Sequence, residues 1–310
     1  MIESERARIF ICGTVRDGGP LLKRRISKLI RTFSRLFEID FYVVESDSSD
    51  QTPRILGRLS REFACFRFIS LGNLQKDLPD RVMRLTYCRN LGLDEFLSRH
   101  KERNYDYYVV LDLDGVNDGL STSSLANSIG LFSEGFDGLF ANQGAFYYDI
   151  GALRAEGWVD GNPHTDYEKL LSIGVDEKGA FKLAIDSRMI RISKEAKPIL
   201  VKSAFGGLGI YKANIVLNSN YSPLSSNSEV SVEHVNFNLR LESQSRLCIV
   251  PWLINTRYTE HTIHKRLDWR VIYGISQPLH KYLKLVLGKE QIEKIVQFLR
   301  RLLSFSLLKN

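Results

Sequence analysis

The sequence contains few cysteines, and those it has are far apart. Cys12, Cys65, Cys88 and Cys248 form no CxxC pair. This spacing excludes a zinc ribbon, and four cysteines in 310 residues argue against a disulfide scaffold. There is no internal repeat and no low-complexity tract. Hydrophobic residues make up 44% and charged residues 25% of the chain, which excludes a disordered or fibrous protein.

Long apolar runs are also missing. No stretch approaches the ~18 uncharged apolar residues that a transmembrane helix needs. Residues 1–8 lack the apolar core of a signal peptide. We therefore expect a cytoplasmic protein.

The chain also has only a small excess of positive over negative side chains. Lys and Arg number 43 against 36 for Asp and Glu, which gives a net charge of +7. This suits an anionic ligand or surface, although a charge this small is also common on proteins without such a partner. Nucleic acid is not an expected partner, because the basic residues are not interleaved with a recognised binding module.

What the sequence does have is alternation of short apolar runs with helical patterns over its first 120 residues. It predicts strands at 9–12, 41–44, 66–69 and 107–112, and helices over 22–37, 55–63 and 80–100. Such alternation implies a parallel sheet, in which ligands bind beyond the carboxyl ends of the strands. From 138 to 260 we expect long loops with short strands at 139–141 and 199–201.

Two aspartates close the fourth predicted strand. Asp112 and Asp114 are two residues apart, so both carboxylates point the same way and suit a hard divalent ion. The alternative is that Asp114-Gly115 is a turn and Asp112 caps a helix near Ser121. An EF-hand loop fits less well, because its sixth position, here Asn117, requires glycine.

Common phosphate-binding motifs are missing after the first strand. Residues 12–19, Cys-Gly-Thr-Val-Arg-Asp-Gly-Gly, match neither G-x-G-x-x-G nor a Walker A loop. This lowers the odds of a dinucleotide dehydrogenase or a P-loop enzyme. Arg16 and Arg89 remain candidates for phosphate binding, against the alternative of solvated surface charges.

The order of these segments resembles the nucleotide-sugar half of GT-A-fold glycosyltransferases. The segments are Cys12–Arg16, the polar turn in Val43–Thr52, Arg89-Asn90-Leu91-Gly92-Leu93 and Asp112-Leu113-Asp114. The second half continues the resemblance with a glycine loop at 205–211, an acidic position at 232–235 and a histidine in 255–261. Residues 146–154 and 233–235 are similar to the fungal capsule-associated mannosyltransferases and their bacterial relatives. The resemblance covers roughly residues 8–262.

The resemblance implies an α/β fold, a GT-A-like (Rossmann-like), mainly parallel sheet flanked by helices. It implies a domain over 1–265, divided into a nucleotide-binding half (1–120) and an acceptor half (121–265). The activity it implies is metal-dependent transfer, with Mn²⁺ or Mg²⁺, from a nucleoside diphosphate sugar. The acceptor would be a saccharide or lipid-linked glycan in surface polysaccharide synthesis. The alternatives are a nucleotidyltransferase and a non-enzymatic basic membrane- or glycan-binding protein.

The resemblance also assigns site residues. The metal ligands would be Asp112, Asp114 and His261, where a structural histidine is the alternative for His261. Donor-binding residues would be Gly13, Thr14, Arg16, Glu45, Asp47, Arg89, Asp112, Gly206 and Gly207. Acceptor-binding residues would be Tyr147, Tyr148 and Asp149. The catalytic residues would be Glu233 and His234. Because many members have a second acid where His234 stands, the base is Glu233, His234 or neither.

The last 35 residues form an amphipathic helical pattern with a basic polar face, and 266–310 are predicted as a helical extension. Residues 278–310 either pack on the domain or lie on an anionic membrane, which would make the protein peripheral on the inner face.

Overall fold

The computed structural model describes residues 6–223, 232–241 and 244–265. The chain divides into two compact units, Met1–Thr259 and Glu260–Asn310. The described part of the second unit contains a short 3₁₀ helix, η5 (Ile263–Lys265). The extension predicted over 266–310, with its membrane segment 278–310, lies outside the described residues.

The first unit alternates strands and helices. Its strands are β1 (Arg8–Val15), β2 (Glu38–Glu45), β3 (Phe66–Ser70), β4 (Tyr107–Asp112), β5 (Gly138–Gln143), β6 (Ile199–Val201), β7 (Leu208–Lys212) and β8 (Leu247–Thr256). Its α-helices are α1 (Leu22–Ser34), α2 (Thr52–Glu62), α3 (Arg81–Arg103), α4 (Thr122–Ile129), α5 (Pro163–Ser172), α6 (Glu177–Ala184) and α7 (Glu233–Leu239). Short 3₁₀ helices are η1 (Leu74–Lys76), η2 (Gly130–Phe132), η3 (Asp186–Arg188) and η4 (Ala213–Val216).

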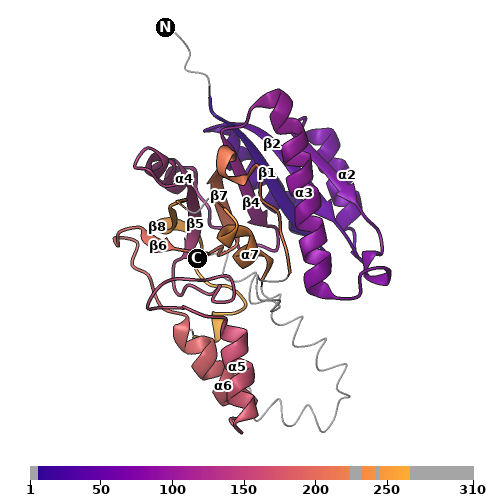
Figure 1. Ribbon diagram of the computed structural model, residues 1–310. Coiled ribbons are helices and arrows are strands. Elements are labelled where there is room, and N and C mark those ends of the chain that lie inside the picture. The colour runs from indigo at the N-terminus through magenta and orange to yellow at the C-terminus, as the bar shows by residue number, and fades with distance from the viewer. Residues whose placement is uncertain (1–5, 224–231, 242–243, 266–310) are drawn as a thin grey trace. The chain divides into compact units, whose positions relative to one another are not determined.

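The described strands form one eight-stranded sheet in the order β3-β2-β1-β4-β7-β5-β8-β6. β1 runs parallel to both β2 and β4, β2 runs parallel to β3, and β5 runs parallel to β8. β7 is antiparallel to both neighbours, and β6 is antiparallel to β8. The predicted mainly parallel α/β sheet flanked by helices is therefore confirmed, with two reversed strands (Figure 1).

Each face of the sheet has its own core, because side chains alternate along a strand. In β1, Ile9 and Ile11 pack on one side with buried residues of α1, α2 and α4. Phe10 and Cys12 pack on the other side with buried residues of α3 and α7. The sheet thus lies between two helical layers, with α3 and α2 on opposite faces of β1 and β2 (Figure 1).

The structure matches the sequence best where periodicity is strong. β4 has the predicted bounds, and the helix predicted over 80–100 is α3. In α7 the side chains of Asn236 and Asn238 are buried, where the amide of Asn236 donates to Ser222 O and that of Asn238 donates to Ala204 O.

Within the residues described, each helix is either too short or too polar to cross a membrane.

Candidate active site

The carboxyl ends of β1, β2, β3 and β4 lie at one edge of the sheet, since these strands run parallel. Thr14 pairs with Val44 on one side and Asp112 on the other. β7 runs the opposite way, so its first residue pairs with Leu111 and the turn before it, at Gly206–Gly207, reaches the same edge. The fold therefore brings these predicted segments together at one edge of the sheet. This is the edge where ligands bind in such sheets.

Asp112 and Asp114 both reach this edge. The Asp112 side chain is 29% exposed, and its Oδ1 accepts a hydrogen bond of 2.6 Å from Arg89 Nη2. Asp114 is exposed, and its Oδ1 accepts from Val116 N at 3.0 Å in a local turn. Burial raises the pKa of Asp112, Arg89 lowers it, and the charge of Asp114 raises it again. The turn alternative thus holds for Asp114, while the cap of α4 is Ser121 and not Asp112.

The two carboxylates fit a hard divalent ion only in part. One oxygen of each, Oδ2 of Asp112 and of Asp114, forms no hydrogen bond within the described segments. No group of three or more His, Cys, Asp or Glu side chains placed to hold a metal occurs among residues 6–223, 232–241 and 244–265. Such a pair fits Mg²⁺ or Mn²⁺ that keeps its remaining positions for water and phosphate oxygens.

Arg89 lies directly beneath Asp112. Its side chain is only 3% exposed, and its Nε lies 3.7 Å from Glu233 Oε1. The guanidinium also lies over the Phe205 ring, 5.3 Å from its centroid. The two carboxylates hold the pKa of Arg89 above its ordinary value in spite of its burial. Arg89 is therefore a buried cation shared by two acids and not the surface charge that the sequence offered as the alternative.

Glu233 begins α7 and is almost completely buried. Burial raises the pKa of its carboxyl, Arg89 lowers it, and the charges of Asp112 and Asp149 raise it. A carboxylate with a raised pKa is a stronger base than an ordinary one. The structure thus brings Glu233 close to the predicted metal pair.

His234 is buried against aromatic rings. It stacks on Phe205 with ring centroids 3.7 Å apart and meets the edge of Tyr221 at 5.5 Å. Neither ring nitrogen has a hydrogen-bond partner in the part of the chain that the structure describes. Burial, with the nearby Arg89 charge, lowers the pKa of His234 well below its ordinary value. The lowered pKa favours the neutral imidazole, whose ring stacks on the residue before the glycine turn and whose Nε2 lies 3.7 Å from Glu233 Oε1.

A neutral buried histidine makes stability depend on pH. The unfolded chain takes up a proton on His234 below about pH 6.5, whereas the folded chain does not, so acid favours unfolding. We expect His234→Phe to remove about 1 kcal/mol of the stability loss between pH 6.5 and 5.5, measured by urea unfolding. His164→Phe, which replaces an exposed histidine, is the control substitution. Equal slopes in wild type and His234→Phe would contradict a neutral His234.

The Gly206–Gly207 turn needs glycine at both positions. Their φ angles are +63° and +83°, a region that side chains disfavour. A Cβ on Gly206 would lie 2.8 Å from Ala141 O, and one on Gly207 would lie 2.4 Å from a Val116 methyl. Asp112 N donates to Gly207 O at 3.0 Å, which ties the turn to the end of β4.

Three buried amides hold this turn from beneath. Gln143 Nε2 and Asn255 Nδ2 both donate to Gly206 O, at 3.0 and 2.8 Å. Asn117 Nδ2 donates to Gly207 O at 2.8 Å and to Asp112 O at 2.9 Å. None of these amides was predicted as a site residue. Asn117 lies three residues after Asp114, but nothing in the local sequence connects it with Gln143 or Asn255.

The other predicted donor-binding residues lie at the same edge with different surroundings. Gly13 and Thr14 lie inside β1, while Arg16 is exposed, with its Nε 3.6 Å from Asp17 Oδ2. Glu45 is buried and accepts from Ser48 N and from the Ser70 hydroxyl.

Asp47 is also occupied within the protein. Its Oδ1 accepts from Gln75 N at 2.7 Å, and its Oδ2 lies 3.6 Å from Arg84 Nε. The carboxylates of Glu45 and Asp47 therefore shape the turn after β2, where the resemblance assigned them to the donor.

The polar turn after β2 is joined to the loop after β1. Ser48 Oγ accepts from Asp17 N, Thr52 Oγ1 from Gly18 N and Asp50 Oδ2 from Gly19 N. These hydroxyl and carboxylate groups satisfy backbone N–H groups of the neighbouring loop. The turn thus fixes the shape of the edge beside Arg16.

The three predicted acceptor residues have unequal access to the edge. The Tyr147 ring is fully buried and packs against Trp158, so neither of its faces is available to a sugar. Asp149 Oδ2 accepts from Gly206 N at 2.9 Å and so supports the glycine turn. Burial raises the pKa of Tyr148 well above its ordinary value, and the charges of Asp112 and Asp114 add to the shift. Tyr148 is thus the predicted acceptor residue within electrostatic reach of both aspartates.

His261 belongs to the second unit, where its Nε2 lies 3.7 Å from Glu260 Oε1. Its assignment as a metal ligand stays a prediction.

No protein-family model and no curated protein matches this chain in sequence. A mannosyltransferase of Pyrobaculum calidifontis, solved with GDP-Man and Mn²⁺, is 13% identical with a TM-score of 0.38, over 79% of this chain and 57% of that one. S. aureus TarS 1–349, solved with UDP-GlcNAc, is 14% identical with a TM-score of 0.42, over 96% and 73%.

A third structure is glucosyl-3-phosphoglycerate synthase of Mycobacterium tuberculosis with UDP, 12% identical, TM-score 0.37, over 90% of this chain and 79% of that one. The chain spans little more than half the length of the mannosyltransferase. At these scores the likenesses carry no conclusion about the activity of this chain.

Proposed function

We propose that this protein is a metal-dependent glycosyltransferase of GT-A-like fold. It moves a sugar from a nucleoside diphosphate sugar to a saccharide or lipid-linked glycan acceptor in surface polysaccharide synthesis. One observation carries the proposal: Asp112 and Asp114 leave β4 at the edge where Arg89, Glu233 and the glycine turn meet.

Asp112 and Asp114 would hold Mn²⁺ or Mg²⁺, which when bound stabilises the charge that develops on the departing diphosphate. Arg89 orients Asp112 through the 2.6 Å bond and keeps its carboxylate charged against the effect of burial. Charged and correctly oriented, Asp112 is ready to bind a cation without rearrangement.

The glycine turn supports the end of β4 beside the proposed metal site. Protein atoms fill the space where side chains at Gly206 and Gly207 would lie, and the three amides hold the turn through its carbonyl oxygens. Glu233 is the proposed base for the acceptor hydroxyl, because its raised pKa makes it a better proton acceptor than an ordinary carboxylate. Phe205, held between His234 and Arg89, fixes where the turn begins.

The test is ligand-linked stabilisation. Wild-type protein with Mn²⁺ and GDP- or UDP-sugars should gain about 2.7 kcal/mol of stability at 100 times the dissociation constant, seen as a rise in Tm. Without the divalent ion, in EDTA, the gain should disappear.

Asp114→Asn should also abolish the gain while leaving the Tm of the free protein within a few degrees, because Asp114 is exposed. The matched control is Asp160→Asn, since Asp160 likewise accepts one backbone N–H, that of Gly157, in an exposed turn. Full stabilisation of wild type by nucleotide sugars in EDTA would overturn metal dependence.

A further inference from the structure

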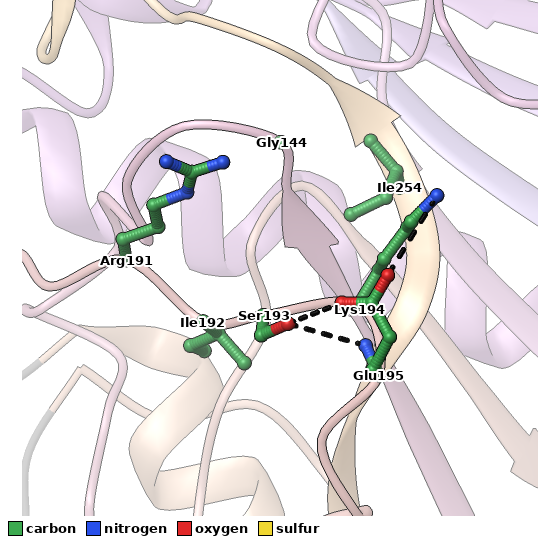
Figure 2. A pocket seen from close by; sticks show the side chains of 7 residues that line it. All are labelled: Gly144, Arg191, Ile192, Ser193, Lys194, Glu195 and Ile254. Carbon is green, nitrogen blue, oxygen red and sulfur yellow. Dashed lines mark hydrogen bonds and ion pairs between the residues drawn. The ribbon is translucent and has the colours of Figure 1, made fainter.

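A cavity of about 190 Å³ lies beside the proposed catalytic edge. It is lined by Gly144, by Ile254 of β8 and by the segment Arg191–Glu195. Figure 2 shows Ile254 and Gly144 on the sheet side of this cavity and the 191–195 segment passing across it. A volume of this size accommodates a small polar group.

The cavity has two lining residues, Gly144 and Ile254, near the same edge of the sheet as Asp112. β4 and β5 both run antiparallel to β7, so their carboxyl ends lie on the same side, and β8 is parallel to β5. Gly144 follows the last residue of β5, and Ile254 pairs with Asn142 near that end. Adjacent strands are about 4.8 Å apart, so β5 lies roughly 10 Å from β4 along the edge.

The sheet-side wall of the cavity is continuous with the support of the glycine turn. Gln143, next to Gly144, donates to Gly206 O and to Asn255 Oδ1. Asn255, next to Ile254, donates to Gly206 O and to Asn117 Oδ1. Because the same buried amides hold both places, a group in the cavity has a fixed position relative to the turn.

Positive charge dominates the rim. Arg191 is exposed, and its positive charge acts on the Glu195 carboxylate. Lys194 Nζ lies 3.8 Å from Glu195 Oε1, and the Glu195 carboxylate also accepts from the Ser193 hydroxyl. Arg191 and Lys194 against the one carboxylate of Glu195 leave an excess of one positive charge among the lining residues.

We propose that this cavity binds a phosphate or carboxylate group carried by the acceptor saccharide. A guanidinium pairs with either anion through two parallel N–H donors, and a neighbouring ammonium adds attraction. That the bound sugar is the acceptor rests on the proposed function. The distance of roughly 10 Å between β5 and β4 then places the anionic group one or two sugar units from the reacting hydroxyl.

The experiment measures sugar binding without the donor site. Glucose 6-phosphate, glucuronate and glucose are titrated into wild-type protein by calorimetry in EDTA with no nucleotide present. We expect at least one of the two anionic sugars to bind about tenfold more tightly than glucose. The tighter of the two identifies phosphate or carboxylate as the preferred group.

Two double variants separate this site from general surface charge. Arg191→Gln with Lys194→Gln should weaken anionic-sugar binding about tenfold and leave glucose binding unchanged. Lys178→Gln with Lys182→Gln removes two exposed cations of α6 that do not line the cavity, and should bind as wild type. Anionic sugars that bind no better than glucose, or an unaltered first variant, would overturn the inference.

Failure of the proposed function gives a different result. The first double variant should keep full stabilisation by Mn²⁺ with a nucleotide sugar, because neither changed residue lies at the Asp112 site. If nucleotide sugars never stabilise wild type but anionic sugars bind as expected, the proposed function fails and the cavity remains an anion site. If nucleotide sugars stabilise wild type and anionic sugars show no preference, the cavity assignment alone fails.

Discussion

Replacing Arg89 by Met is expected to destabilise the fold by about 3–5 kcal/mol, measured by urea unfolding. The substitution keeps much of the side-chain volume but removes the charge between Asp112 and Glu233. Both carboxylates would then be buried or half-buried without the guanidinium that now lies 2.6 Å from one and 3.7 Å from the other. The loss is large because an unpaired buried charge is far less stable than a pair.

Two comparisons identify charge pairing as the cause. Arg188→Met breaks the 2.7 Å pair with Asp166, which is more exposed, and should cost about 1 kcal/mol or less. A triple variant, Arg89→Met with Asp112→Asn and Glu233→Gln, should recover much of the stability, since all three charges are then absent. If the triple variant is as unstable as Arg89→Met, packing and not charge explains the loss.

Arg89→Lys is the conservative test of orientation. A lysine keeps the charge but has no planar fork to reach two carboxylates and cover Phe205 at once. We expect it to keep more of the stability than Arg89→Met and to lose most of the Mn²⁺-dependent stabilisation by nucleotide sugars. Wild-type stabilisation in Arg89→Lys would contradict a geometric role.

The sheet could be predicted where apolar periodicity and burial agree. Tyr107–Asp112 is a central strand covered on both faces, so its residues before Asp112 are apolar or aromatic, and its bounds agree with the prediction. The sequence did not predict β7, because its residues fall in the predicted glycine loop at 205–211. Its direction, opposite to that of β4 and β5, depends on pairing with these two strands. Such pairing is set by contacts distant in the sequence, which local pattern does not contain.

The site was predicted as a set of segments but not as a set of contacts. Asp112, Asp114 and Gly206–Gly207 do meet at one edge, because strand direction alone brings them there. Whether an acid faces a ligand or the protein is decided by neighbours. Asp47 Oδ1 accepts a hydrogen bond from the backbone N–H of Gln75 in η1, 28 residues away, and no local motif signals that bond.

Replacing Glu233 by Gln should lower turnover by about 10²- to 10⁴-fold, the usual contribution of a general base. The amide keeps the shape of the carboxylate but accepts no proton. Turnover is measured per folded molecule as release of nucleoside diphosphate from the nucleotide sugar, with water as the acceptor. Mn²⁺-dependent stabilisation by the donor should stay near that of wild type, because this variant keeps the Asp112–Arg89 bond.

The dependence on pH separates Glu233 from His234. Because the pKa of Glu233 is raised, its carboxylate becomes protonated, and turnover falls, at a pH above the ordinary glutamate value of about 4.3. The pKa of His234 lies well below the ordinary histidine value of about 6.5, so protonation of His234 does not cause this fall in turnover. His234→Phe preserves the stack on Phe205. It should therefore keep most of the turnover and the same fall of turnover at low pH.

Glu95→Gln is the control for losing a carboxylate elsewhere, since Glu95 pairs with Arg67 and Arg99 on the outer side of α3. It should keep wild-type turnover per folded molecule. If Glu233→Gln has the same turnover as this control, Glu233 takes no part in the reaction. A large loss in His234→Phe together with wild-type turnover in Glu233→Gln would instead assign the base to the histidine, against the neutral, stacked ring in the structure. We expect the opposite, since only the carboxylate is both raised in pKa and within 3.7 Å of the guanidinium that holds Asp112.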